Sequence, residues 1–341
     1  MHSQHARVLS RRRFLRGITL AGTGGLLGLR ATLVTAEPPP ETTHIRLSKG
    51  TAGICTAPQW VAEELLRGEG FSQVQYIEKY RPIETYKALA SGELQVSFGF
   101  GAKFLTMVDE GEPIVFLAGG HVGCFELFGT DHVRAIRDLK GKTVAVLELG
   151  GVEHLFLASM AAYVGIDPRQ DINWVTHPPD EAIRLLAEEK IDAYLAFPPG
   201  AQELRARNIG HVVVNSSEDR PWSQYFCCLI AENREFVRKS PIATKRALRA
   251  LLKAADICAL EPERSAQLLV DQGVAKRYDY ALQLMKDLPY GRWREYDPED
   301  TVRFYALRLH EAGMIKSSPQ KLITQATDWR FLNALKKEMK G

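Results

Sequence analysis

Short apolar runs alternate with amphipathic segments from about residue 44 onward. The runs are rich in Val, Ile and Leu, which is typical of strands buried in an α/β sheet. The amphipathic segments repeat their apolar residues at helical spacing. Strands are predicted at 44–47, 74–78, 94–98, 114–118, 125–129, 143–147, 172–175, 193–196, 212–214 and 225–231. Helices are predicted at 59–67, 83–90, 102–110, 154–163 and 179–188, and then in close succession at 241–260, 263–272, 278–288, 298–312 and 319–326.

This alternation predicts an α/β fold built on mainly parallel sheets. The pattern starts twice, and the two series meet near the glycines of 119–123. The strongly apolar stretch that begins at Tyr225 can carry the chain back to the first unit. We therefore expect two lobes. The first combines 44–122 with the returning 227–341 and its C-terminal helices, and the second is 123–226. A ligand cleft would lie between them, at the carboxyl ends of the strands.

The stretch 143–163 is the most suggestive local pattern. An apolar strand runs into Gly150-Gly151, and a helix follows from His154. Glycine allows a sharp turn and a close approach by a ligand. The unpaired N–H groups of a helix start favour a hydrogen-bond acceptor. The stretch therefore predicts contact with a polar group of a ligand, and the alternative is an ordinary connection between strand and helix.

Composition narrows the class of protein. The chain has 341 residues, 45% of them hydrophobic, enough for one large core or two ordinary ones. Its formal net charge of +3 is too small to indicate binding to nucleic acid. After the N-terminal segment, no apolar run has the length needed to span a bilayer.

Cysteine spacing gives no sign of a metal framework. The five cysteines are Cys55, Cys124, Cys227, Cys228 and Cys258, and none is spaced as CxxC. On a regular strand the neighbouring Cys227 and Cys228 point to opposite faces, so they would not both ligate one centre. We therefore expect no metal and no cofactor.

The N-terminus carries the pattern of an export signal. Arg11 and Arg12 lie in the stretch SRRRFLR, which a moderately apolar segment and small residues up to Ala36 follow. The pattern resembles a twin-arginine (Tat) signal peptide over 1–36, cleaved after Ala36, with a linker at 37–43. It implies export of a folded protein to the periplasm. The alternative is a basic cytosolic tail.

Five stretches together carry a family resemblance. Residues 88–99 read ALASGELQVSFG, which is similar to an element of periplasmic substrate-binding proteins of the nitrate/sulfonate/taurine ABC-transporter type. These proteins are related to the domain of thiamine-pyrimidine synthesis proteins. Further similar elements follow in the same order at 138–146, 163–167, 182–194 and 197–199. The resemblance covers 45–231 well and the helical tail only loosely.

The resemblance implies a fold and a role. The fold is a two-lobed periplasmic binding protein of type II (a venus flytrap) with a helical C-terminal part, which closes on its ligand by hinge motion. The role is that of a non-enzymatic, monomeric protein that captures a small organic or oxyanion ligand. It would deliver this ligand to an ABC permease in the inner membrane.

The expected ligand contacts follow from the matching positions. The resemblance places them in the first loop, after the third strand, at the lobe crossing and at the two cleft-facing ends of the second lobe. They are Thr51, Gly53, Cys55, Phe98, Gly99, Phe100, Gly120, His121, Gly150, Gly151, Glu153, His154 and Phe197, and an aromatic Tyr225 adjoins them.

Three of these residues leave alternatives open. A carboxylate at Glu153 would repel an anion at the helix start, so either it points away or the ligand is neutral or cationic. His121 is either a ligand contact or a buried structural histidine. The sequence places no base near Cys55 that would activate its thiol. Cys55 is therefore expected to be a small apolar pocket residue and not a nucleophile.

Three other functions remain as alternatives. A thiamine-pyrimidine-synthesis-like enzyme would need a cysteine-rich segment, and the Cys227-Cys228 pair is not such a segment. A Tat-exported cofactor-binding protein would need a metal-spaced His/Cys set or GxGxxG, and neither is present. A periplasmic sensor subunit would use the same fold as an importer's binding protein.

Overall fold

The computed structural model describes residues 37–49, 53–79 and 81–340. The expected signal peptide, with Arg11, Arg12 and Ala36, lies outside these residues, as does Thr51. Residues 39–341 form one compact unit. No helix in the described part of the chain combines the length and apolar character that crossing a bilayer requires.

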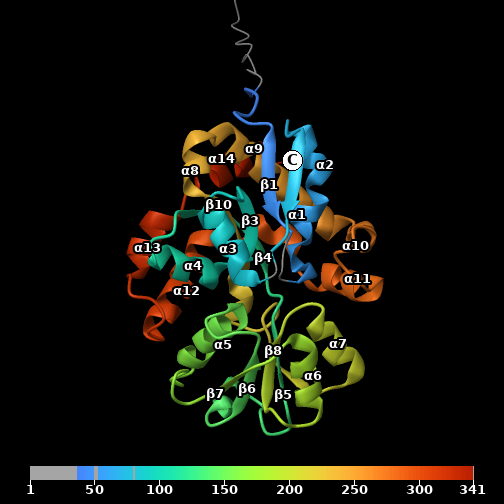
Figure 1. The fold of residues 1–341 in the computed structure, drawn as a ribbon, viewed down its shortest axis with the longest axis vertical. Helices are drawn as coiled ribbons and strands as arrows, with labels where there is room; N and C mark the ends of the chain where they lie inside the picture. The colour runs from blue at the N-terminus through green and yellow to red at the C-terminus, as the bar shows by residue number, and fades with distance from the viewer. Residues whose placement is uncertain (1–36, 50–52, 80, 341) are drawn as a thin grey trace, which may run out of the picture. The chain divides into compact units, whose positions relative to one another are not determined.

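Two five-stranded sheets organise this unit (Figure 1). The first has the strand order β2-β1-β3-β10-β4, and we call it with its helices lobe 1. Its strands are β1 (His44–Ser48), β2 (Gln73–Ile77), β3 (Val96–Phe100), β4 (Ile114–Val122) and β10 (Phe226–Asn233). β1 pairs in parallel with β2 and β3, whereas β10 runs antiparallel between β3 and β4.

The second sheet, the centre of lobe 2, repeats this plan. Its order is β7-β6-β8-β5-β9. Its strands are β5 (Glu126–Gly129), β6 (Thr143–Val146), β7 (Asn173–Thr176), β8 (Ala193–Ala196) and β9 (His211–Asn215). β6 is parallel to β7 and β8, and β5 is antiparallel to β8 and β9. In both sheets the antiparallel strand is the one that directly follows a crossing from the other lobe, so the mainly parallel sheets we predicted are mixed.

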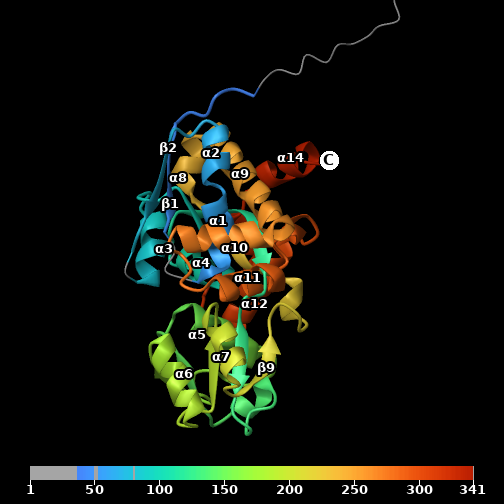
Figure 2. The ribbon, with the colours of Figure 1, turned by 90° about the vertical axis from the view of Figure 1, so that its right-hand side faces the viewer.

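Most helices belong to lobe 1 (Figures 1 and 2). They are α1 (Ala57–Val61), α2 (Glu63–Gly68), α3 (Pro82–Ala90), α4 (Gly101–Asp109), α8 (Arg234–Lys239), α9 (Pro241–Leu260), α10 (Pro262–Asp271), α11 (Tyr278–Asp287), α12 (Pro298–Glu311), α13 (Pro319–Ala326) and α14 (Arg330–Glu338). Lobe 2 contains α5 (Val152–Tyr163), α6 (Pro179–Ala187) and α7 (Gly200–Arg207). The lobes meet where α4 and α12 pack against α5, and where α11 packs against α7.

The long helix α9 is the central support of lobe 1. It packs against α1, α2, α10 and α14. Proline occupies its first turn, where a missing N–H costs nothing. Its buried face consists largely of alanine and leucine, which allows neighbouring helices to approach closely. The predicted range 241–260 coincides with this helix.

Other element predictions need correction. The single helix predicted at 59–67 is two short helices, α1 and α2, that meet at Ala62. Helices α7 and α8 were not predicted, and of α14 only its end at 336–338 was expected. α7 has little apolar periodicity because it carries Gln202, Glu203, Arg205 and Arg207 within eight residues. Because most of its side chains are polar, hydrophobic spacing does not predict this helix.

Asn233 joins the end of β10 to two helices. Its Oδ1 accepts hydrogen bonds from the N–H groups of Glu235 (3.0 Å) and Phe236 (3.2 Å), which caps α8. Its Nδ2 donates to the carbonyls of Leu89 (3.0 Å) and Ala90 (2.8 Å) at the end of α3. One buried amide thus satisfies four backbone groups.

Asn233→Ala is therefore expected to lower the free energy of unfolding by about 2–3 kcal/mol, because it removes the cap of α8 and the side-chain donor shared by the carbonyls of Leu89 and Ala90. Urea denaturation measures this loss. Ser318→Ala is the matched control, since Ser318 caps the exposed start of α13 with one hydrogen bond of 3.3 Å. The control should lose about 1 kcal/mol or less. Equal losses in the two variants would contradict the role of Asn233 as a link between elements.

Candidate functional site

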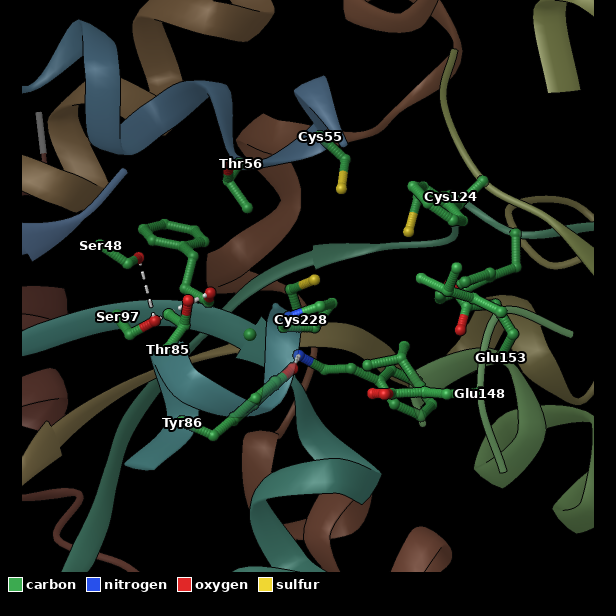
Figure 3. A pocket seen from close by; sticks show the side chains of 18 residues that line it. Ser48, Cys55, Thr56, Thr85, Tyr86, Ser97, Cys124, Glu148, Glu153 and Cys228 are labelled. Carbon is green, nitrogen blue, oxygen red and sulfur yellow. Dashed lines mark hydrogen bonds between the residues drawn. The ribbon is translucent and has the colours of Figure 1, made fainter. Parts of the chain in front are cut away.

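A cavity lies where the two lobes face each other (Figure 3). Lobe 1 contributes residues from the ends of β1 and β3, from α3 and from β10. Lobe 2 contributes the turn after β6, the start of α5 and the end of β8. The lining consists of Ser48, Cys55, Thr56, Pro82, Thr85, Tyr86, Ser97, Phe98, Gly99, Phe100, Cys124, Phe125, Leu147, Glu148, Val152, Glu153, Phe197 and Cys228. The cavity therefore has the position that the sheet topology favours for a ligand.

The cavity is small. The space open to the centre of a water molecule is about 60 Å³, where about 10–15 Å³ on this measure holds one water. It has room for an ion or for a solute of a few heavy atoms in the form the structure shows. An aromatic ring with substituents would require the lobes to separate.

The polar groups of the cavity are hydroxyls, thiols and carboxyls. The hydroxyls of Ser48 and Ser97 lie 3.1 Å apart and share a hydrogen bond. The hydroxyl of Tyr86 accepts a hydrogen bond from the N–H of Phe100 at 3.2 Å. None of the lining residues that the structure describes is lysine, arginine or histidine. This lining offers an anion no opposite charge.

Glu153 lies buried at the lobe 2 side of the cavity. It belongs to the first turn of α5, and 6% of its surface is exposed. Burial, together with the nearby carboxylate of Glu148, raises the pKa of Glu153 to about 7. The carboxyl side chain therefore does not point away into solvent. It faces the cavity as a group that is close to half protonated near neutral pH.

Sulfur atoms form the opposite wall. The thiols of Cys55, Cys124 and Cys228 line the cavity and turn toward one another in Figure 3. Cys55 comes from the turn Ile54–Thr56, Cys124 from the crossing between β4 and β5, and Cys228 from β10. His121 of β4 is fully buried and contributes a ring nitrogen to the same cluster, and the four donor atoms lie within 4.8 Å of one another. Spacing along the chain gave no indication of this cluster.

The prediction that Cys227 and Cys228 point to opposite faces is wrong. Their Sγ atoms lie 4.0 Å apart, and the Sγ of Cys227 is 3.1 Å from that of Cys124. The pairing of β10 with β4 shifts register between Phe226 and Cys228. Such an irregularity locally breaks the alternation of side chains along a strand. Burial raises the pKa of the Cys124 and Cys227 thiols.

The structure brings only part of the predicted contact set to the cavity. Cys55, Phe98, Gly99, Phe100, Glu153 and Phe197 line it. Gly53, Gly120, His121, Gly150, Gly151, His154 and Tyr225 do not belong to the lining. Sequence reasoning missed the hydroxyl side chains of Ser48, Thr85, Tyr86 and Ser97 and the thiols of Cys124 and Cys228. Every one of these ligand contacts stays a prediction.

The residues outside the lining have structural contacts. His154 accepts a hydrogen bond from the N–H of Gly150 through Nδ1 at 3.1 Å, and its ring packs on Trp174. The ring of Phe98 lies against Gly120, where a Cβ would come within 2.6 Å of it. Tyr225 stacks on Phe304 with ring centroids 3.9 Å apart.

Direct contacts hold the lobes together around the cavity. Arg205 of α7 donates to Glu126 of β5 at 2.6 Å and to Asp287 of α11, in lobe 1, at 2.8 Å. Lys103 of α4 donates to the carbonyl of Gly150 in lobe 2 at 3.0 Å. Gly53 has φ +33°, and a Cβ there would lie 2.6 Å from the carbonyl oxygen of Pro198. The first loop of lobe 1 therefore approaches the end of β8 as closely as the absence of a side chain allows.

The fold is that of periplasmic substrate-binding proteins. Similar solved structures include the periplasmic nitrate-binding protein NrtA from Synechocystis PCC 6803, with a TM-score of 0.73 and 15% identity over 89% of this chain and 90% of that chain. The alkanesulfonate-binding protein SsuA from Xanthomonas axonopodis pv. citri, bound to MOPS, has a TM-score of 0.66 and 14% identity over 85% of this chain and 99% of that chain. SsuA from Escherichia coli has a TM-score of 0.67 and 14% identity over 82% and 91% of the two chains.

The sequence comparisons point to the same group. Residues 126–270 match the model of the NMT1-like family. The chain is also 23% identical, over 245 residues, to the nitrate import ATP-binding protein NrtC of Synechocystis, covering 65% of this chain and 36% of that protein. The chain described here thus spans about a third of the length of this curated relative. The predicted resemblance and the predicted two-lobed α/β fold are confirmed.

The buried carboxyl of Glu153 predicts a pH-dependent stability. Because its pKa is about 7 when folded, against an ordinary value of 4.5, the folded state holds the proton over a pH range where the unfolded state has lost it. Stability contributed by the neutral form is present below pH 4.5 and is lost as the pH rises toward 7. Glu153→Gln should match the wild type at pH 4 and exceed it at pH 8 by about 1–3 kcal/mol in urea denaturation.

Glu232→Gln is the matched control. Burial raises the pKa of Glu232 to about 8, and this residue of β10 does not line the cavity. The Glu232→Gln substitution should also stabilise the protein at high pH, but it should leave the affinity for a ligand in the cavity unaltered. If E153Q is less stable than the wild type at pH 8, the carboxylate of Glu153 does not destabilise the folded state, which contradicts the prediction.

Proposed function

We propose that this protein is the solute-binding component of an ABC importer. The observation that carries the proposal is the small cavity enclosed by two lobes, with lining residues from both sheets. Two connecting segments, 123–125 and 216–225, join the lobes, which is the arrangement that permits hinge closure on a ligand. The protein would act by binding and handing over a solute, without catalysis and without a cofactor, as a monomer.

The lining supports a neutral or cationic ligand. Nitrate and sulfonate are the ligands that the names of the similar proteins print. In the cavity described here, however, no lysine, arginine or histidine faces the ligand space, and Glu148 and Glu153 adjoin it. Two carboxyl groups in a lining without lysine, arginine or histidine disfavour an oxyanion. The resemblance in fold therefore supports the transport role, and the lining indicates a different ligand.

The compartment follows from the N-terminal pattern. We place the mature protein in the periplasm, exported by the Tat route with cleavage after Ala36. The twin arginines Arg11 and Arg12 and the small residues before Ala36 support this placement. The partner would be a permease in the inner membrane.

A thermal-shift screen tests the proposed function. The panel contains nitrate, bicarbonate, taurine, alkanesulfonates, aminopyrimidines, short amines and divalent and monovalent metal ions. A ligand at a hundred times its dissociation constant should stabilise the fold by about 2.7 kcal/mol, which raises the melting temperature measurably. A hit among cations or neutral solutes, weakened by a change in the lining, supports the proposal. A tight oxyanion hit would contradict the ligand class.

The Arg205–Asp287 ion pair gives a test of lobe closure. Asp287→Asn removes the contact that reaches from lobe 2 to lobe 1 while leaving the pair between Arg205 and Glu126 intact. Because the side chain of Asp287 is 37% exposed, the affinity for the ligand should fall only about twofold to fivefold. Small-angle scattering of the ligand-bound protein should show a larger radius of gyration.

Glu188→Gln is the control for that change. Glu188 pairs with Arg184 at 2.6 Å and with Lys190 at 2.7 Å, and all three residues belong to lobe 2. It should alter neither the affinity nor the scattering. If both variants bind alike, the ion pair plays no part in closure.

A further inference from the structure

Four soft-metal donors converge at the inner wall of the cavity. They are the Sγ atoms of Cys55, Cys124 and Cys228 and one ring nitrogen of His121, all within 4.8 Å of one another. In a tetrahedral zinc site with metal–sulfur bonds of about 2.3 Å, the sulfur atoms lie about 3.8 Å apart. The donors therefore need to approach one another by about 1 Å or less to hold an ion.

The fold explains how distant residues meet here. Cys228 on β10 is the direct cross-strand partner of His121 on β4, so these two side chains are neighbours across an antiparallel pair. Cys124 follows two residues after the end of β4 and has φ +96°. A non-glycine residue in this backbone region is uncommon and costs about 1–3 kcal/mol. The unusual conformation turns the Cys124 thiol to the same side as the other two.

The hydrogen bonds of His121 leave one nitrogen free for a ligand. Nδ1 lies 3.3 Å from the carbonyl oxygen of Val122. A carbonyl oxygen can only accept, so Nδ1 carries the proton and Nε2 keeps its lone pair. That Nε2 is buried and has no hydrogen-bond partner. A histidine whose other nitrogen donates to a backbone carbonyl is the usual arrangement of a metal ligand.

Tyr290 supports two members of the cluster. Its hydroxyl donates to the carbonyl of Cys55 at 2.9 Å, and its ring packs edge-on against His121 with centroids 5.4 Å apart. Tyr290 is fully buried. The positions of Cys55 and His121 are thus set by packing and by a hydrogen bond as well as by the chain itself.

We propose that Cys55, Cys124, Cys228 and His121 bind a thiophilic d10 cation, Zn²⁺ or Cu⁺, at the sulfur wall of the cavity. Thiolate ligands select these ions over the oxygen-preferring Mg²⁺ and Ca²⁺, and three sulfurs with one imidazole suit tetrahedral coordination. The unpaired Nε2, which costs stability without a partner, gains one in the metal-bound form.

The cation reaches this site through the cavity. All three thiols belong to the cavity lining, so the ion does not have to pass through a packed core. The inference rests on the proposed function for its biological meaning, because it identifies the ligand class of the same cavity. Cys55 belongs to the first loop of lobe 1 and Cys124 to the crossing segment. Metal binding would therefore fix the first loop to the hinge of the two lobes.

Cobalt substitution followed by zinc and copper competition tests the site. The purified protein is reduced with a phosphine, so that pairing of Cys124 with Cys227 cannot mask the thiols. One equivalent of Co²⁺ should produce thiolate-to-cobalt charge-transfer bands and intense visible bands of tetrahedral coordination. The ligating thiols release their protons when the Co²⁺ binds, and stoichiometric Zn²⁺ or buffered Cu⁺ should then abolish the bands by displacing the Co²⁺. Which of the two competes at the lower concentration identifies the preferred ion.

Alanine substitutions identify the ligands. The affinity for Zn²⁺ should fall at least about tenfold in each of the variants Cys55→Ala, Cys124→Ala, Cys228→Ala and His121→Ala. Removal of a residue that only hydrogen-bonds to a metal ligand can already cause a loss of this size. Cys258→Ala is the matched control, because Cys258 is an equally buried thiol on α9 outside the cluster. It should bind like the wild type. Circular dichroism and melting temperature establish that each variant is folded.

The outcomes separate this inference from the proposed function. Octahedral, weakly absorbing cobalt, or equal losses in C258A and the cluster variants, would overturn the metal site. If another solute then stabilises the wild type and C258A alike, the binding-protein role stands without the metal site. A third outcome is that the metal binds as expected, but scattering shows no closure of the lobes and the importer does not carry the metal into cells. The metal site is then confirmed, and the metal is not the transported solute.

Discussion

The two crossings between the lobes are the constraint on which the rest of the structure depends. β10 enters lobe 1 from lobe 2 and runs antiparallel between β3 and β4. β5 enters lobe 2 from lobe 1 and runs antiparallel between β8 and β9. Each sheet is therefore completed in its interior by a strand that begins at the opposite lobe. The carboxyl ends of the other strands must then face the same gap, and the cavity lies there.

The crossings also determine which side chains meet. Because β10 lies next to β4, Cys228 faces His121, and the segment that leaves β4 brings Cys124 beside both. Glu153 and Glu232 are buried without a basic residue among the causes of their raised pKa values. Of these two residues Glu153 lines the cavity, and its carboxyl group favours a neutral or cationic ligand over an anion.

The sequence predicted the elements of the fold much better than the contents of the site. Apolar runs and amphipathic periods identify β8 and α9 at their observed bounds, because burial of one face leaves a direct pattern in the residues. The cluster leaves no such pattern. Its members lie at 55, 121, 124 and 228, and only the register of β10 on β4 makes two of them neighbours. The irregular pairing at Phe226–Cys228 also interrupts the alternation of side chains between the two faces of the sheet, on which the prediction for Cys227 and Cys228 relied. Pairing register is a tertiary property that short-range spacing does not encode.

Fold and ligand chemistry are separable in this protein. The arrangement of strands matches proteins named for nitrate and alkanesulfonates, yet the side chains of the described lining carry thiols, hydroxyls and carboxyls and no positive charge. A binding-protein fold supplies a cleft and a hinge, and the side chains at the strand ends select what enters. Since three cysteines and a histidine with an unpaired nitrogen converge there, the chemistry of sulfur is a better guide to the ligand than the names of the structural relatives.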